Sequence, residues 1–269
     1  MSRIPIALTI AGSDSGGGAG IQADLKTFSS HGVYGASVLT ALTAQNTVGV
    51  TAIHDVPPEF ISEQMDAVFS DLAVDAVKIG MLSQIPVIEA VVDGLGKHAA
   101  RNVVLDPVMV TTSGDPLLAE EAVSAIRNIL LPVADLITPN LHEAAKLTDM
   151  PLAEDDAMMI EQAQALLGCG AKAVLVKGGH GGSDTCSDLL AFGGRLEWFH
   201  AERIDTNNTH GTGCSLSSAI ASELAKGKPV IEAVENAKDW LTQAIQHSDE
   251  LDVGAGPGPV HHFHNLWSK

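Results

Sequence analysis

Residues 205–214 read DTNNTHGTGC, and the small and apolar run SLSSAI follows them directly. This stretch predicts a phosphate-binding loop at the start of a helix. Gly211 and Gly213 let the backbone pass close to an anion without Cβ atoms in the way. The unpaired N–H groups of the first helical turn then point at that anion. We therefore expect the start of this helix to be part of a functional site.

The thiol of Cys214 stands in the electrostatic field of this predicted helix start. The positive end of a helix macrodipole favours thiolate over thiol, so we expect the pKa of Cys214 to fall below the free value of roughly 8.5. Cys214 is thus a candidate base or nucleophile beside a phosphate. Cys169 and Cys186 lack this context, and we interpret them as structural, reduced thiols.

The composition limits the possible architecture and partners. With 269 residues and 45% hydrophobic content the chain can bury a full core, and we expect one domain spanning residues 1–269. A formal net charge of −18 argues against nucleic acid or an anionic membrane as a partner, because both attract basic surfaces. No apolar run reaches the roughly 18 residues of a membrane span, and the N-terminus does not resemble a signal peptide. We expect a soluble, cytoplasmic protein.

Apolar, β-rich runs alternate with longer segments of helical period. This alternation is typical of βαβ units and predicts an α/β fold with a mainly parallel sheet covered on both faces. The expected strands are residues 6–11, 37–43, 76–79, 103–105, 136–138 and 173–176. The expected helices are residues 19–30, 58–70, 86–98, 117–130, 140–146, 155–167 and 229–246, besides the helix after the phosphate loop. A hairpin is expected at residues 185–192 and 196–203, with Gly193 and Gly194 between its strands.

The first expected strand runs into a glycine-rich segment, AGSDSGGGAGIQAD, at residues 11–24. A Walker loop would close with Gly-Lys-Ser/Thr, whereas Ile21 follows here. Residues 18–23 match the dinucleotide-binding pattern GxGxxG/A, but the acidic residue expected about twenty positions later is missing. Three interpretations remain open: a dinucleotide-binding loop, a flexible ligand loop at the carboxyl end of the first strand, and a glycine-rich turn without a ligand.

Polar side chains follow three further expected strands. Asp106 comes directly after one strand, Asn140 and Glu143 follow the next, and Lys177 follows a third. Asn140 and Glu143 also fit an ordinary helix cap with a reciprocal glutamate. Two acidic groups near a phosphate loop suit Mg²⁺, which prefers one or two carboxylates plus substrate phosphates. Lys177 is either a solvated lysine or a contact to a nucleotide phosphate.

Histidines occur beside the phosphate loop and near the C-terminus. His210 directly precedes Gly211, and both packing and phosphate contact are open for it. We interpret the C-terminal histidines as part of a solvated polar tail in preference to a metal site. They are His261, His262 and His264. The aromatic residues Phe263 and Trp267 are expected to dock this tail on the body of the protein.

Several segments, taken together, resemble a known family. They are DTNNTHGTGC with its following helix, the initial AGSDSGGGAGIQAD, the turn DPVM at residues 106–109 and the segment TPNLHEA at residues 138–144. In their order and spacing they resemble the ribokinase superfamily, and more closely its hydroxymethylpyrimidine/phosphomethylpyrimidine kinases of thiamin biosynthesis. The likeness runs from Ile4 to Gln246.

The resemblance implies a single kinase domain with a three-layer α/β/α ribokinase-like fold and a site across the carboxyl edge of its sheet. It implies that ATP, with Mg²⁺, phosphorylates 4-amino-5-hydroxymethyl-2-methylpyrimidine to its monophosphate and then to the diphosphate. It also implies assembly into a homodimer.

The resemblance further implies a role for each matching residue. Gly211, Thr212 and Gly213 would form the anion hole, and Cys214 would be the catalytic base. Lys177 would bind the nucleotide together with Thr212.

Metal and substrate contacts follow from the same resemblance. Asp106 and Glu143 would belong to the magnesium and phosphate network. Gln45 matches the position that hydrogen-bonds the pyrimidine. The other implied substrate contacts are Gly12, Ala19, Asp24, Met81 and Val108.

Three other functions remain open. A pyridoxal kinase of the same superfamily differs in the acceptor ring and not in the transfer chemistry. An NAD-dependent oxidoreductase would use the GAGIQA match but leaves GTGC without a purpose. A ligand-binding sensor without turnover would share the fold, although the combination of acidic residues, lysine and cysteine weighs against it.

Glycine-marked stretches at 114–115 and 178–182 are candidates for closing over the substrate and the nucleotide, respectively.

Overall fold

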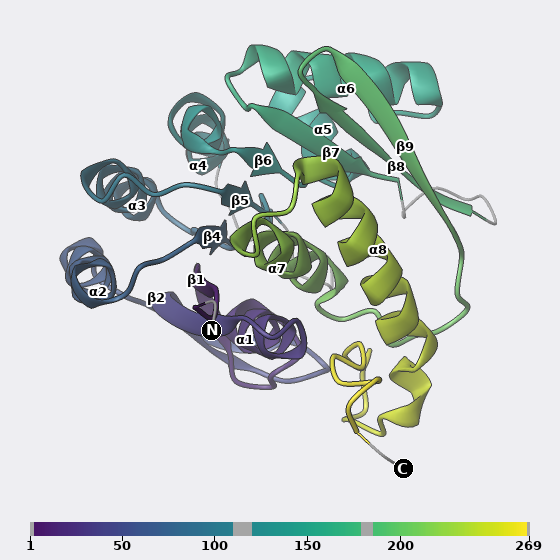
Figure 1. Ribbon diagram of the computed structural model, residues 1–269, viewed down its shortest axis with the longest axis horizontal. Helices are drawn as coiled ribbons and strands as arrows, with labels where there is room; N and C mark the ends of the chain where they lie inside the picture. Colours follow the sequence, from purple (N-terminus) through teal and green to yellow (C-terminus); the bar gives the residue numbers. More distant parts are fainter. Residues whose placement is uncertain (1–2, 110–119, 179–184, 268–269) are drawn as a thin grey trace.

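The computed structural model describes residues 3–109, 120–178 and 185–267. Its described strands form one nine-stranded sheet in the order β3-β2-β1-β4-β5-β6-β7-β8-β9, with helices on both faces (Figure 1). The predicted three-layer α/β/α fold is confirmed. The strands are β1 Ile6–Asp14, β2 Tyr34–Gln45, β3 Val50–Asp55, β4 Ala76–Ile79, β5 Val103–Leu105, β6 Leu136–Ile137, β7 Ala173–Lys177, β8 Thr185–Phe192 and β9 Arg195–Glu202. The helices are α1 Gly20–Ser30, α2 Pro58–Asp71, α3 Ile85–Lys97, α4 Glu120–Ala125, α5 Leu141–Thr148, α6 Asp156–Gly168, α7 Thr212–Ala225 and α8 Val230–Gln246, with single turns at Ile126–Leu130, Leu131–Val133 and Ser248–Glu250.

The six strands from β2 to β7 in the middle of the sheet run parallel. At the edges, β3 pairs antiparallel with β2, β8 with β7, and β9 with β8. The central strands are apolar at nearly every position because helices cover both of their faces. In β1, for example, Leu8 and Ile10 pack into the core beneath α2 and α3, whereas Ala7 belongs to the core beneath α1, α7 and α8.

The parallel arrangement determines where polar residues gather. Chain segments that leave β1, β4, β5, β6 and β7 all do so at the same edge of the sheet, since carboxyl ends of parallel strands coincide. Helix α7 packs across β1, β4 and β5 in the middle of one face (Figure 1). Its N-terminus therefore meets the loops after these strands.

Strand β3 was absent from the sequence-based prediction. It is an edge strand that pairs antiparallel with β2, and five of its six residues are exposed. A strand that buries neither face needs no apolar run, so the pattern that revealed the central strands was missing here.

The helix expected at residues 117–130 is only partly correct. The described part begins at Glu120, and its regular α-helix ends at Ala125, followed by a π-helical turn and a 3₁₀ turn. Pro132 lies in the 3₁₀ turn, where its missing N–H and fixed φ prevent continuation of an α-helix. The candidate closing stretches 114–115 and 179–182, like residues 117–119, lie outside the described residues.

The predicted hairpin is confirmed by β8 and β9. Gly193 and Gly194 have φ of 53° and 77°, as a two-residue hairpin turn with matching twist requires. The turn brings Phe192 opposite Arg195 and extends the sheet beyond β7.

The C-terminal segment after α8 folds back on the body of the protein. His261 and His262 are buried, so the interpretation of these residues as a solvated tail is wrong. The predicted docking of the C-terminal segment on the body of the protein is confirmed. The buried residues of the segment are 258–262, whereas Trp267 is 60% exposed. None of the described helices combines the length and the apolar character that spanning a membrane would require.

Candidate active site

A cavity of about 620 Å³ opens at the carboxyl edge of the parallel strands. It extends from the loops after β1 and β2, across the ends of β5 and β7, to β9 and α8. Its wall contains every predicted site residue except Asp24. These are Gly12, Ala19, Gln45, Met81, Asp106, Val108, Glu143, Lys177, Gly211, Thr212, Gly213 and Cys214.

The phosphate loop at the head of α7 depends on glycine. Gly211 has a φ of 77°, and a Cβ there would collide with the carbonyl oxygen of Gly18. A Cβ on Gly213 would lie 3.4 Å from Lys177 Nζ and 3.5 Å from Asp106 Oδ2. The start of α7 thus lies directly over a lysine and a carboxylate. The N–H of Thr212 donates to the carbonyl oxygen of Thr209 over 3.3 Å, a long bond, and the start of a helix is a suitable place for a phosphate.

Asp106 lies beneath this loop, and its side-chain contacts to other described residues are long. Lys177 Nζ donates to Asp106 Oδ1 over 3.2 Å, and the hydroxyls of Thr138 and Ser217 approach the same carboxylate at 3.4 Å. Although burial by itself lowers the pKa of Lys177, the charges of Asp106 and Glu143 hold it above its ordinary value. The lysine is therefore a fixed positive charge at the phosphate end of the cavity.

Glu143 caps a helix and also lines the cavity. Its backbone N–H donates to Asn140 Oδ1 over 2.9 Å, and its Oε2 accepts from the backbone N–H of Asn140 over 2.8 Å, which is a complete capping box. The same carboxylate also lines the cavity. Burial raises the pKa of Glu143 to about 7, with Lys177 opposing the increase and Asp106 adding to it.

These acidic residues fit the Mg²⁺ that the family resemblance implies. The described residues contain no group of three or more His, Cys, Asp or Glu side chains arranged to hold a metal by themselves. Magnesium does not require such a cage, since it retains water and takes one or two carboxylates together with substrate phosphates. The long contacts of Asp106 leave its oxygens available to accept from metal-bound water.

The thiol of Cys214 lies in the cavity wall but has a different acidity from the one expected. Burial raises the pKa of Cys214 to about 11, against the opposing positive charge of Lys78. The carboxylates of Asp24 and Asp106 raise it further. The expectation of a lowered pKa for Cys214 is wrong, because loss of water around the sulfur outweighs the effect of the helix N-terminus. Cys214 is a neutral thiol at neutral pH.

Asp24 does not belong to the cavity wall. It is fully buried, and its carboxylate accepts from Thr9 Oγ1 at 2.6 Å, Ser218 Oγ at 2.6 Å and Lys78 Nζ at 2.9 Å. All three partners come from the protein, so the prediction of a substrate contact at Asp24 is wrong. Asp24 is instead the counterion of Lys78.

Lys78 was overlooked in the sequence. It is fully buried in β4, yet it also contributes to the cavity wall near Cys214. Burial on its own would lower the pKa of Lys78, but the charge of Asp24 in particular keeps it above the ordinary value. The signal was present, because a lysine inside the short apolar strand AVKI needs a buried partner to be tolerated.

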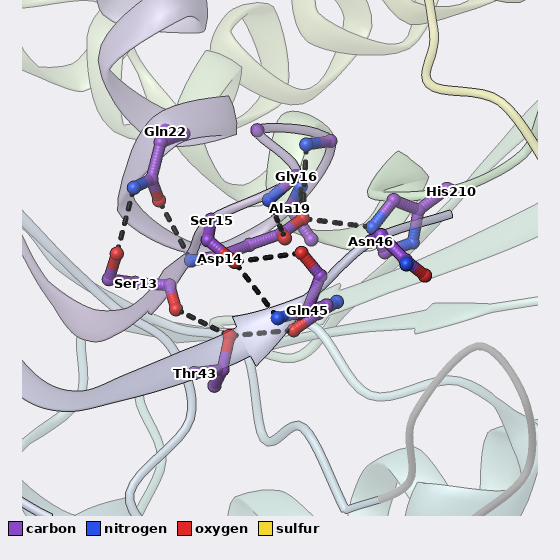
Figure 2. Close-up of polar contacts among 12 residues, drawn as sticks. Ser13, Asp14, Ser15, Gly16, Ala19, Gln22, Thr43, Gln45, Asn46 and His210 are labelled. Atoms are coloured by element: carbon purple, nitrogen blue, oxygen red, sulfur yellow. Dashed lines mark hydrogen bonds and ion pairs between the residues drawn. The ribbon is translucent and has the colours of Figure 1, made fainter. Parts of the chain in front are cut away.

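The predicted pyrimidine contacts other than Asp24 line the cavity. Figure 2 shows the polar contacts around one of them, Gln45. Thr43 Oγ1 donates to Gln45 Oε1 over 3.1 Å, which orients the side-chain amide. The backbone of Gln45 is held by Ser15, whose hydroxyl both donates to Gln45 O and accepts from Gln45 N. A Cβ on Gly12 would lie 3.0 Å from Met81 Cε, so glycine keeps this part of the wall open.

A buried contact between an imidazole and a carboxylate joins the two glycine-rich segments (Figure 2). His210 Nε2 lies 3.0 Å from Asp14 Oδ2, which also accepts from the backbone N–H groups of Gly18 and Ala19. Burial alone would raise the pKa of Asp14, but the His210 contact and the backbone donors lower it below its ordinary value. The glycine-rich loop is therefore a packed part of the site, built around the carboxylate of Asp14.

Comparison with known proteins agrees with this geometry. The family model described as phosphomethylpyrimidine kinase matches residues 14–261. The chain belongs to the phosphomethylpyrimidine kinase family. A hydroxymethylpyrimidine/phosphomethylpyrimidine kinase of Rhizobium meliloti (strain 1021) is 60% identical, over 97% of this chain and 98% of that protein. The chain is a phosphotransferase, which leaves the oxidoreductase and sensor hypotheses without support.

Solved structures of two kinds of kinase are similar to this chain. The crystal structure of a phosphomethylpyrimidine kinase from Clostridium difficile 630 is 44% identical with a TM-score of 0.81, covering 90% of this chain and 100% of that one. An ADP complex of Bacillus subtilis pyridoxal kinase is 38% identical with a TM-score of 0.91, covering 99% of this chain and 100% of that one.

The far end of the kinase cavity is formed by β8, β9 and α8. Leu241 and Ile245 of α8 and Cys186 of β8 are among the residues that line this end. Cys186, which we had interpreted as structural, thus lines the cavity. Beside it Lys238 Nζ donates to Asp188 Oδ2 over 2.6 Å, a buried pair that closes the wall.

Proposed function

We propose that this kinase phosphorylates 4-amino-5-hydroxymethyl-2-methylpyrimidine to its monophosphate and then to the diphosphate in thiamin biosynthesis. The relatives named above support this substrate. The observation that carries the proposal is the single cavity that joins the predicted pyrimidine contacts around Gln45 to the phosphate loop at Gly211. The pyrimidine alcohol and its monophosphate can then each place their attacking oxygen next to the γ-phosphoryl group of ATP.

ATP is the proposed donor, bound with its base toward α8 and its phosphates toward the loop of residues 211–213. Phosphoryl transfer needs alignment and positive potential where charge spreads over the moving group. The N–H groups of the loop and Lys177 provide that potential. Asp106 and Glu143 would hold Mg²⁺, which neutralises phosphate charge when bound.

The first transfer requires removal of a proton. The hydroxymethyl oxygen forms a bond to the γ-phosphorus as the bond to the leaving ADP oxygen breaks, and the hydroxyl proton passes to Cys214 as thiolate. Because the thiol has a pKa of about 11, only a small fraction is thiolate at neutral pH. Lys78 stabilises that fraction electrostatically.

The second transfer does not require the base. A phosphate monoester has a second pKa of about 6, so its oxygen is already anionic at neutral pH. Its attack on the γ-phosphorus again breaks the bond to ADP and releases no proton. Cys214 then only lines the pocket.

A pyridoxal kinase is the second candidate function. The high structural similarity to the Bacillus subtilis pyridoxal kinase favours it, and the transfer chemistry would be unchanged. Comparing turnover of pyridoxal with that of the pyrimidine alcohol decides between them.

The proposal is tested by incubating the protein with ATP, Mg²⁺ and the pyrimidine alcohol and analysing the products by mass. We expect the monophosphate first and the diphosphate later. Absence of both products, with pyridoxal phosphate formed under the same conditions, would favour the second candidate.

We further propose a single kinase domain that acts as a homodimer in the cytoplasm, as in the implied superfamily.

A further inference from the structure

The C-terminal segment lies against the β2–β3 hairpin before it reaches the phosphate loop. The backbone N–H of Gly256 donates to Thr47 Oγ1 over 3.2 Å. Gly254 has a φ of 77°, and a Cβ on either glycine would collide with Thr47. Glycine at positions 254 and 256 therefore lets the backbone of the segment pass close to Thr47.

The segment then bonds to the loop that leads into α7. The backbone N–H of His210 donates to the carbonyl oxygen of Gly258 over 3.1 Å. In return, the backbone N–H of Gly258 donates to Asn208 Oδ1 over 2.9 Å. The main chain of His210 is thus held by the C-terminal segment, while its side chain is held by Asp14.

A third contact reaches the first turn of α7. His262 Nε2 lies 3.0 Å from the hydroxyl oxygen of Ser215, and both side chains are buried. Ser215 directly follows Cys214. Burial, together with the charges of Lys26 and His261, lowers the pKa of His262 to about 3, so the imidazole is neutral at the pH where the enzyme works.

We propose that the C-terminal segment, residues 256–262, is a positioning element of the phosphate loop, with His262 as its principal side chain. It holds residues 208–215 through Gly258 and His262, and so sets where the N–H groups of residues 211–213 meet the transferred group. The inference rests on the proposed function, since it assumes that these N–H groups hold the phosphoryl group in transfer. A displacement of about 1 Å in such a loop can reduce a rate by up to roughly 100-fold.

The test compares His262→Ala with His264→Ala in the full-length protein. His264 is the matched control because it is a partly exposed imidazole two residues beyond the segment. Its Nδ1 contacts the carbonyl oxygen of His261, and its ring stacks on His247, away from Ser215. We expect His262→Ala to lower kcat about tenfold in both phosphorylations, with the KM for the pyrimidine alcohol within about twofold of wild type. His264→Ala should change neither. His262→Gln, which can still hydrogen-bond Ser215, should recover most of kcat.

The outcomes separate this inference from the proposed function. A wild-type protein without kinase activity would overturn the function, whereas an active wild type and an equally active His262→Ala variant would overturn the inference alone. Equal losses in His262→Ala and His264→Ala, or no recovery with His262→Gln, would also overturn it, because they would indicate general destabilisation. If His262→Ala does not fold, Asn208→Ala decides by the same criterion: a tenfold lower kcat supports the inference and wild-type kcat contradicts it.

Discussion

At the scale of single residues, the acidity of Cys214 is the property on which the chemistry depends. A helix start favours a thiolate, but the sulfur is also surrounded by protein and near two carboxylates. The effect of burial is the larger one, and the thiol is neutral at neutral pH. A base of this kind works through its small ionised fraction, which makes its contribution visible in two experiments.

The first experiment removes the thiol. We expect Cys214→Ala to slow phosphorylation of the pyrimidine alcohol by roughly 100-fold or more, the usual range for loss of a general base, and to change phosphorylation of the monophosphate little. The two rates are measured with each substrate separately. Cys169→Ala is the control, since Cys169 packs at the end of α6 away from the cavity. Equal losses in both steps would mean that Cys214 acts in binding or structure.

The second experiment varies pH. Only the thiolate accepts a proton, and its fraction grows with pH at all values below the pKa of about 11. We expect kcat/KM of the first phosphorylation to rise roughly tenfold per unit between about pH 7 and about pH 9. The second phosphorylation should stay nearly constant over this range. A first step that is already independent of pH near neutrality would show that the thiolate is formed in the free enzyme.

At the scale of secondary-structure elements, one buried ion pair connects both α1 and α7 to the sheet. Asp24 of α1 accepts from Lys78 of β4, Thr9 of β1 and Ser218 of α7. The four side chains come from four elements, and the charges of Asp24 and Lys78 neutralise each other inside the protein. The pair therefore fixes how α7, and with it the phosphate loop, lies on the sheet.

Replacing Lys78 by Met should reveal this contribution. The variant leaves Asp24 buried without its counterion, and we expect the free energy of unfolding to fall by roughly 3–5 kcal/mol. Urea denaturation followed by circular dichroism measures the change. Lys97→Met, which breaks an exposed pair with Asp66, should cost less than about 1 kcal/mol. Similar losses in the two variants would show that the buried pair has no special role.

The same elements show what the sequence could predict. Central strands such as β4 and β7 were recognisable because strands buried on both faces are apolar throughout. The hairpin was recognisable from Gly193 and Gly194. Strand β3 was not, because an exposed edge strand lacks that pattern, and Lys78 was overlooked because its counterion lies 54 residues away.

At the scale of the whole molecule, the site is assembled from segments far apart in the chain. Asp14 and His210 are 196 residues apart and hold the two glycine-rich loops together. The glycine-rich motifs themselves indicated the loops, but no local pattern indicates which distant side chain will join them. The contribution of the C-terminal segment was hidden for the same reason, since His262 meets Ser215 only through the folded structure.

The central claim is that the N–H groups at the start of α7 hold the migrating phosphoryl group while Cys214 faces the acceptor hydroxyl. A crystal structure with ADP, Mg²⁺, aluminium fluoride and the pyrimidine alcohol tests it most directly. We predict that the fluoride accepts hydrogen bonds from residues 211–213 and that the hydroxymethyl oxygen lies within about 3.5 Å of the sulfur of Cys214. A fluoride bound away from these N–H groups, or a hydroxymethyl group turned away from the sulfur, would contradict the account.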